Sequence, residues 1–124
     1  MTEVLIATLA FYLLQLMLPS VMALARGEVD AAFLFSSRDQ QGERSPIVRR
    51  AQRSCVNMQE SLIVFLPLMG IAMVSGTNIA ETATIWLGLR IAYLITYLMA
   101  VSYVRTFIWL GSVYFLSVMA FALV

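Results

Sequence analysis

The sequence contains no histidine and no lysine, and Cys55 is its only cysteine. A single cysteine cannot form an internal disulfide, and the common zinc sites and nucleophile–histidine pairs need residues that are absent here. No glycine-rich phosphate-binding loop is present either. These absences argue against a metal site, against most hydrolase chemistry and against a phosphate-binding loop.

Charge is also scarce, since only 12% of the 124 residues are charged whereas 61% are hydrophobic. Soluble domains carry about twice that share of charged residues. The net charge of +1 gives no basic surface for nucleic acid. All eight basic residues are arginines, and six of them lie in one segment: Arg26, Arg38, Arg44, Arg49, Arg50 and Arg53. The composition predicts an integral membrane protein of one domain with no nucleic-acid partner.

Four apolar segments are long enough to cross a hydrocarbon core of about 30 Å. They cover approximately residues 3–25, 47–74, 79–100 and 104–124. A signal peptide is the competing reading of the first, because Ala23-Leu24-Ala25 is similar to a cleavage site. Its length and the acidic Glu3 favour a retained helix. Because the last two links are very short, we expect an all-α membrane fold, an up-down bundle of four transmembrane helices.

The polar segment 26–46 is the one long loop of this prediction, and a short apolar patch at 31–35 suits the headgroup region of the membrane. Cytoplasmic loops carry an excess of arginine and lysine. We therefore expect the loop to face the cytoplasm and both chain ends to lie on the other side. Arg105 falls on the cytoplasmic side, where topology alone would also explain it.

Two polar stripes interrupt the second and third apolar segments. Arg53, Asn57 and Glu60 are spaced i, i+4, i+7, and Arg90, Tyr93 and Tyr97 are spaced i, i+3, i+7, so each set shares one helix face. Ionisable groups inside a bilayer are costly unless paired, and they mark functional sites by default. We expect the two stripes to form one site, with Glu60 neutralising one arginine and the surplus positive charge holding an anion.

Structural roles compete with this reading. Three arginines near the predicted interface would serve as topology signals or extend their guanidinium groups to the headgroups: Arg49, Arg50 and Arg53. Asn57 and Glu60 would then be hydrogen-bonding contacts between helices. Arg90 is harder to explain in this way, because it lies near the middle of its segment and too deep to reach the headgroups easily.

Two sequence motifs resemble those of the MAPEG family, the membrane-associated proteins of eicosanoid and glutathione metabolism. The segment from Arg50 to Glu60 reads RAQRSCVNMQE and resembles the second-helix signature of Arg, three residues, Asn, two residues and Glu. In the third segment Arg90, Tyr93 and Tyr97, followed by Arg105, give a second match. The order, the spacing and the four-span layout agree over essentially the whole chain.

The resemblance implies a homotrimer of four-helix protomers, with glutathione bound between neighbouring subunits and open to the cytoplasm. It implies a bacterial-type member in the inner membrane, in contact with membrane lipids and with a lipophilic small molecule or lipid as second ligand. Arg105 would stabilise the glutathione thiolate. The glutathione-binding residues would be Arg53, Asn57, Glu60, Arg90, Tyr93 and Tyr97, with Arg26 as a further arginine.

The chemistry of glutathione agrees with these residue types. Its two carboxylates suit arginine side chains and its ammonium suits Glu60, while a nearby guanidinium favours the nucleophilic thiolate. The implied activity is that of a glutathione transferase, with or without peroxidase activity, on lipophilic electrophiles. A non-catalytic lipid- or protein-binding member of the same fold is the alternative. A small multidrug transporter is a remote one, because its membrane glutamate would lie in the first helix, where this chain has only Glu3.

Overall fold

The structure of the chain is a computed structural model that describes residues 1–37, 42 and 44–124. Within these residues all regular secondary structure is helical. Arg38, one of the arginines of the predicted cytoplasmic segment, lies outside them. The helices are α1 (Thr2–Ala25), α2 (Ala31–Phe35), α3 (Pro46–Ser75), α4 (Ala80–Leu98) and α5 (Ser102–Ala122). The four long ones agree with the predicted segments to within a few residues, and α2 is a short additional helix inside the predicted loop.

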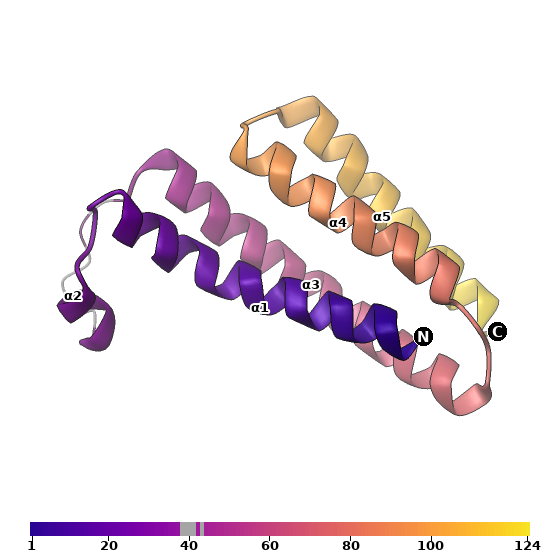
Figure 1. The fold of residues 1–124 in the computed structure, drawn as a ribbon. Coiled ribbons are helices and arrows are strands. Elements are labelled where there is room, and N and C mark those ends of the chain that lie inside the picture. Colours follow the sequence, from indigo (N-terminus) through magenta and orange to yellow (C-terminus); the bar gives the residue numbers. More distant parts are fainter. Residues whose placement is uncertain (38–41, 43) are drawn as a thin grey trace.

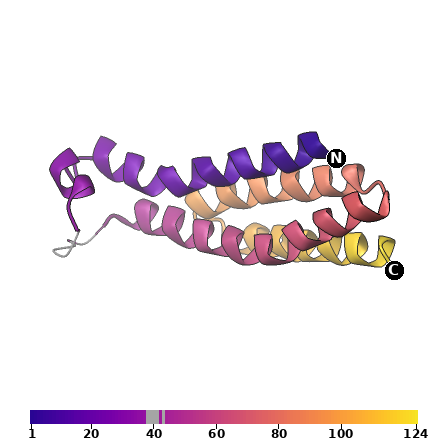
Figure 2. The same ribbon diagram turned by 90° about the horizontal axis from the view of Figure 1, so that it is seen from below.

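The four long helices run alternately up and down as two hairpins, α1 with α3 and α4 with α5 (Figures 1 and 2). Helix α4 also packs against α3, which joins the hairpins. Both chain ends lie at one end of the bundle, and α2 and the α4–α5 turn lie at the other (Figure 1). We call the latter the loop end.

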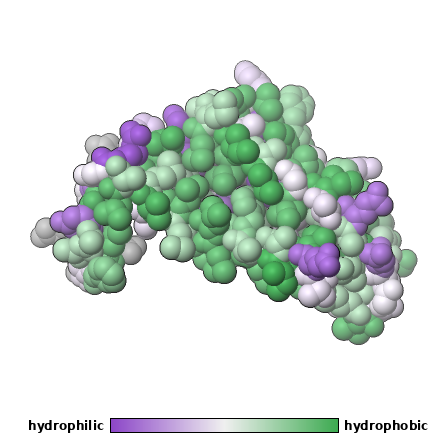
Figure 3. All heavy atoms as spheres, viewed as in Figure 1, coloured by the Kyte–Doolittle hydropathy of each residue, from purple (hydrophilic) through white to green (hydrophobic). Residues whose placement is uncertain are grey.

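Within the described residues, α1, α3 and α5 are long and apolar enough to cross a membrane. Helix α4 is less hydropathic because it carries Glu81 in its first turn and Arg90 at its centre. Apolar side chains cover most of the face seen in Figure 3, and hydrophilic ones gather toward the two ends. These helices identify an integral membrane protein; a membrane crossing by α4 stays a prediction.

The core is a line of apolar side chains at heptad-like spacing on α3, facing a similar line on α4. On α3 it comprises Met58, Leu62, Phe65, Met69 and Ala72, all buried. Phe65 stacks on Trp86 of α4 with ring centroids 4.2 Å apart. Such a pair stabilises a fold by about 0.5–1.5 kcal/mol beyond the burial of its area. This contact fixes the rotation of α4 about its axis. It therefore also fixes the direction of Arg90 and Tyr93, which lie one and two turns further along the same face.

Polar side chains also join α1 to α3. Gln15 is buried and donates from Nε2 to Ser54 Oγ at 3.3 Å, and Gln59 Nε2 donates to Tyr12 Oη at 2.6 Å. The sequence showed Gln15 only as an interruption of an apolar run. In the structure these bonds are side-chain contacts between helices, of the kind that membrane bundles use in place of hydrophobic driving force.

Three helices end in the same way, with one residue in the left-handed conformation. Gly27 after α1 and Gly76 after α3 both have φ of +73°, as glycine allows without strain. The corresponding residue after α4 is Ala100, with φ of +60°. Its N–H bonds Tyr97 O at 3.1 Å, and the next N–H, of Val101, bonds Thr96 O at 3.0 Å. The α4–α5 turn is therefore closed by hydrogen bonds and strained at Ala100.

We expect Ala100→Gly to stabilise the protein by about 1 kcal/mol, because a left-handed residue with a Cβ costs roughly that amount. Thermal or denaturant unfolding in detergent measures the change. Gly27→Ala and Gly76→Ala are the matched controls and should lower the stability. An added Cβ meets no atom within 4 Å at either position, so only backbone strain would act. Unchanged or lower stability of Ala100→Gly would contradict a strained turn.

Candidate functional site

A polar pocket opens where α3, α4 and α5 meet toward the loop end. It has a volume of about 170 Å³ and is lined by Asn57, Tyr93, Tyr97, Arg105, Thr106 and Trp109. Its origin is the buried line of α4, which continues from Ile79, Ala83 and Trp86 into Arg90, Tyr93 and Tyr97 at the same heptad-like spacing. The same face is thus apolar toward the chain ends and polar toward the loop end.

Arg90 lies behind this pocket and holds Asn57. Its side chain is only 1% exposed, and Nη2 donates to Asn57 Oδ1 at 2.7 Å. Arginine has no acceptor, so this bond fixes the amide orientation and leaves the Asn57 Nδ2 protons available to a ligand. The guanidinium carbon also lies 4.5 Å from the centre of the Tyr93 ring. Among the described residues, Nε and Nη1 of Arg90 have no hydrogen-bond partner.

Tyr97 lies between two further arginines. Arg53 Nε donates to the Tyr97 hydroxyl at 3.1 Å, and the guanidinium carbon of Arg105 lies 4.5 Å from the centre of the Tyr97 ring. Tyr93 and Tyr97 meet edge to face with centroids 5.5 Å apart. The two predicted stripes therefore meet, through Arg53 with Tyr97 and through Asn57 with Arg90.

A second, more apolar groove of about 360 Å³ continues from the pocket along α3 and α5. Asn57 and Trp109 line both hollows. Val64, Val113 and Leu116 give the groove its apolar wall, and Glu60 lies on its rim with Ser61. Because the two hollows share these residues, a ligand with a polar head and an apolar tail would contact both surfaces.

Two predicted site residues lie apart from the pocket contacts. Glu60 makes no ion pair with Arg53 or Arg90 within the described residues, where Arg26 with Glu28 is the one ion pair found. Arg26 lies beyond the end of α1 and donates from Nε to Glu28 Oε2 at 3.2 Å. Its role as a glutathione-binding residue stays a prediction. In this structure Arg26 serves the α1–α3 connection instead.

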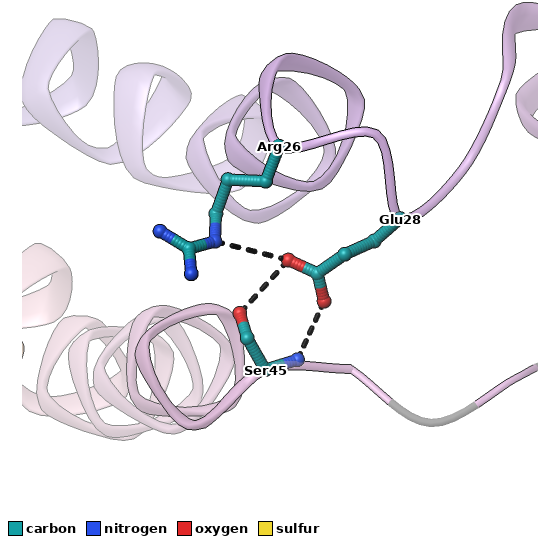
Figure 4. Close-up of polar contacts among 3 residues, drawn as sticks. All are labelled: Arg26, Glu28 and Ser45. Atoms are coloured by element: carbon teal, nitrogen blue, oxygen red, sulfur yellow. Dashed lines mark hydrogen bonds and ion pairs between the residues drawn. The ribbon is translucent and has the colours of Figure 1, made fainter.

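Figure 4 shows that connection. Glu28 accepts from both the backbone N–H and the hydroxyl of Ser45, the residue that precedes α3, and from Arg26 after α1. The carboxylate thereby caps α3 from across the loop, since Ser45 makes no side-chain cap of its own. These bonds, first of all the one from the Ser45 backbone, lower the pKa of Glu28 below its ordinary value.

We expect Glu28→Gln to lower thermal stability at neutral pH, because the charged acceptor that ties α1 to α3 is lost. A lowered folded-state pKa means that the wild-type contribution is present above the ordinary carboxyl pKa and is lost as the pH falls through the lowered one. Melting curves in detergent from pH 7 downward measure it. Asp30→Asn is the control, since it removes a charge from the same loop but keeps the acceptor that caps α2. Parallel pH profiles for wild type and Glu28→Gln would contradict this role.

The sequence analysis did not predict the roles of three residues in and beside the pocket. Thr106 and Trp109 line the pocket from α5, and their only signal is their position one and four residues after Arg105. Arg50, read as a topology signal, donates from Nη1 to Leu98 O at 3.4 Å and so reaches the end of α4. A cation at a helix C-terminus is favourable, and here it lies beside the strained turn that connects α4 to α5, the helix of Arg105.

Comparison with known protein families identifies the family of this chain. The family model of the MAPEG family matches residues 4–124, which is essentially the whole chain. No curated protein and no solved structure matches the sequence. The family match agrees with the motifs around Arg53 and Arg90 and with the apolar helices that carry them. This chain belongs to the MAPEG family of membrane proteins.

Proposed function

We propose that this chain binds glutathione in the polar pocket and joins it through its sulfur to a lipophilic electrophile. The observation that carries the proposal is the convergence of arginine donors on one hollow of a MAPEG protein. Arg105 lines the pocket itself, and Arg53 and Arg90 reach its lining side chains Tyr97 and Asn57.

The donors around the pocket fit an anionic tripeptide. Asn57 is oriented by Arg90 so that its amide protons are available, and Arg105 adds a guanidinium in the pocket. Arg90 is 1% exposed and acts on a ligand through Asn57 rather than by direct contact. Glutathione supplies two carboxylates for Asn57 and Arg105 and an ammonium for Glu60, which lines the adjoining groove.

The chemistry that we propose needs a thiolate. An ordinary thiol with a pKa of about 8.5 is mostly protonated at neutral pH. A guanidinium close to the sulfur favours the charged form, and the proton leaves to water. The sulfur lone pair then forms a bond to the electrophilic carbon, and the leaving group departs with its bonding electrons. Arg105 is the residue assigned to the thiolate, and the adjoining groove would admit the lipophilic partner.

The proposal includes the assembly and the membrane setting. Helix α4 would cross the membrane together with α1, α3 and α5, and α3 would shield its Arg90 from lipid. A homotrimer would complete each glutathione site with a neighbouring subunit. The arginine-rich loop end would face the cytoplasm, in keeping with the positive-inside rule, and the membrane would be a bacterial inner membrane.

The test uses the purified protein in detergent and in liposomes. Glutathione should raise the melting temperature, and conjugation to 1-chloro-2,4-dinitrobenzene should exceed that of a lipid blank. Ophthalmate, which has a methyl group in place of the thiol, should stabilise the protein without being conjugated. Absence of both stabilisation and conjugation would overturn the proposal. If glutathione stabilises the protein but no lipophilic halide is conjugated, the protein binds glutathione and the proposed transferase activity is wrong.

The apolar groove supports a second candidate, a non-catalytic lipid-binding protein. Its apolar wall would hold an acyl chain whether or not glutathione binds. Lipid that co-purifies in stoichiometric amount, together with no response to glutathione, would favour this candidate.

A further inference from the structure

Helix α2 is a fixed structural element despite its five residues. Asp30 Oδ1 accepts from the N–H of Phe33 at 2.7 Å, and Ser36 Oγ donates to Phe33 O at 2.6 Å. Capping at both ends holds the helix in one conformation, although isolated helices of this length are unstable. The direction in which its side chains point is therefore defined.

The two sides of α2 differ. Phe33 and Leu34 are half-buried and, together with Pro19, Ser20 and Ala23 of α1, line a small pocket. On the other side Phe35 is 92% exposed. Helix α2 is therefore held against α1 by Phe33 and Leu34, while Phe35 points away from the protein.

The position of α2 indicates what that phenylalanine meets. Helix α1 exposes Met17, Val21 and Leu24, an i, i+4, i+7 stripe that faces lipid in a membrane-spanning helix. Pro19, Ser20 and Ala23, which line a pocket together with α2, belong to the last two turns of α1, and Pro19 and Ala23 are buried on its inner side. In Figure 1 α2 is displaced sideways from the end of α1, away from α4 and α5, rather than continuing along the bundle axis. It therefore lies beside the bundle at the depth where the lipid-facing stripe ends.

The charges around α2 suit the headgroup layer. The Arg44 guanidinium carbon lies 5.1 Å from the centre of the Phe33 ring, and Arg26 is about half exposed (53%). Aromatic rings with arginines beside them are typical of the membrane interface, where the cation reaches phosphate and the ring reaches the acyl boundary.

We propose that α2 is a membrane-interface anchor: it lies in the headgroup layer of the protein's own membrane and inserts Phe35 toward the acyl chains. The occupant of this exposed face is lipid, because α2 lies at the depth of the last turns of the membrane-spanning α1 and is flanked by cations. The anchor holds the 26–45 connection, with its Glu28–Ser45 contacts, against the membrane. It does not depend on glutathione binding.

Spin-label accessibility tests the anchor in liposomes of phosphatidylethanolamine and phosphatidylglycerol. A nitroxide is attached at Phe35→Cys in a Cys55→Ser background, with Cys55→Ala as the second background should serine lower the yield. Met17→Cys is the lipid reference, and Asn78→Cys, at an exposed position in the link between α3 and α4, is the water reference. We expect the label at position 35 to collide with oxygen more than with a nickel chelate, as at Met17. Preference for the nickel chelate would overturn the anchor, and so would low collision with both, which indicates cover by protein.

A measurement without a label gives an independent check. Phe35→Ser should expose the connection, so that trypsin cleaves after Arg26 or Arg44 in proteoliposomes several-fold faster than in wild type. Phe35→Leu keeps an apolar side chain and should cleave at the wild-type rate. Equal cleavage of Phe35→Ser and wild type would contradict the anchor.

Discussion

Replacing Arg90 with methionine is expected to weaken glutathione binding by about 10- to 100-fold, because a hydrogen bond to a charged group contributes about 1.5–3 kcal/mol. The effect arises although Arg90 does not line the pocket. Without the bond to Oδ1, the Asn57 amide is free to turn, and Tyr93 loses the cation against its ring. Binding is measured by calorimetry or by the melting temperature at several glutathione concentrations.

The same variant should remain folded. Methionine retains most of the apolar length of arginine, and removal of a buried charge removes its desolvation cost. Against this stands the unpaired Oδ1 of Asn57, so we expect little net change in melting temperature. Arg90→Lys is the matched control that keeps the charge but loses the planar fork, and Asn57→Asp tests the orientation of the amide directly. Unchanged affinity in Arg90→Met would show that Arg90 serves packing alone.

The sequence predicted the contacts between α3 and α4 because both helices follow a regular period. Arg53, Asn57, Arg90 and Tyr97 were placed on two faces by spacing, and the structure brings those faces together. The inward direction of the α4 face follows from the heptad-like line that ends in Trp86. Periodicity thus predicts which residues share a face, and core packing decides which face turns inward.

What the sequence could not predict depends on non-local geometry. Glu60 shares a face with Arg53, yet it lines the apolar groove, while Arg53 bonds Tyr97 and Arg90 bonds Asn57. Arg105 is the only charged residue of α5, so no polar stripe indicated which face of this helix lines the site, and Trp109 was not foreseen. Arg26 bonds Glu28 in the irregular segment after α1, where helical periodicity does not apply and so could not predict the contact.

The short α4–α5 turn also limited prediction. Glycine usually marks such a left-handed helix end, and Ala100 gives no such signal. The predicted third segment accordingly ran to residue 100, two residues past the end of α4 at Leu98. This turn matters for the site because it joins Tyr97 to Arg105.

Replacing Arg105 with alanine is expected to lower the rate of glutathione conjugation by about 10- to 100-fold at neutral pH, with a smaller loss of affinity. Each pKa unit by which the guanidinium lowers the bound thiol corresponds to about 1.4 kcal/mol, a factor of ten in the thiolate fraction. The bound thiol should therefore ionise at higher pH in the variant, and the rate should recover as the pH rises. The ultraviolet absorbance of the bound thiolate, followed against pH beside the rate, measures both effects.

The contact between Arg105 and Tyr97 refines this expectation. The guanidinium carbon lies 4.5 Å from the ring centre, a cation–π contact made by a planar group that lysine lacks. Arg105→Lys should therefore restore part of the thiolate fraction but less than the full rate. Tyr103→Phe, at an 84% exposed position in the first turn of α5, is the neutral control. If Arg105→Ala keeps the wild-type titration of the bound thiol, another arginine stabilises the thiolate, and Arg53, which shares Tyr97 with it, is the next to replace.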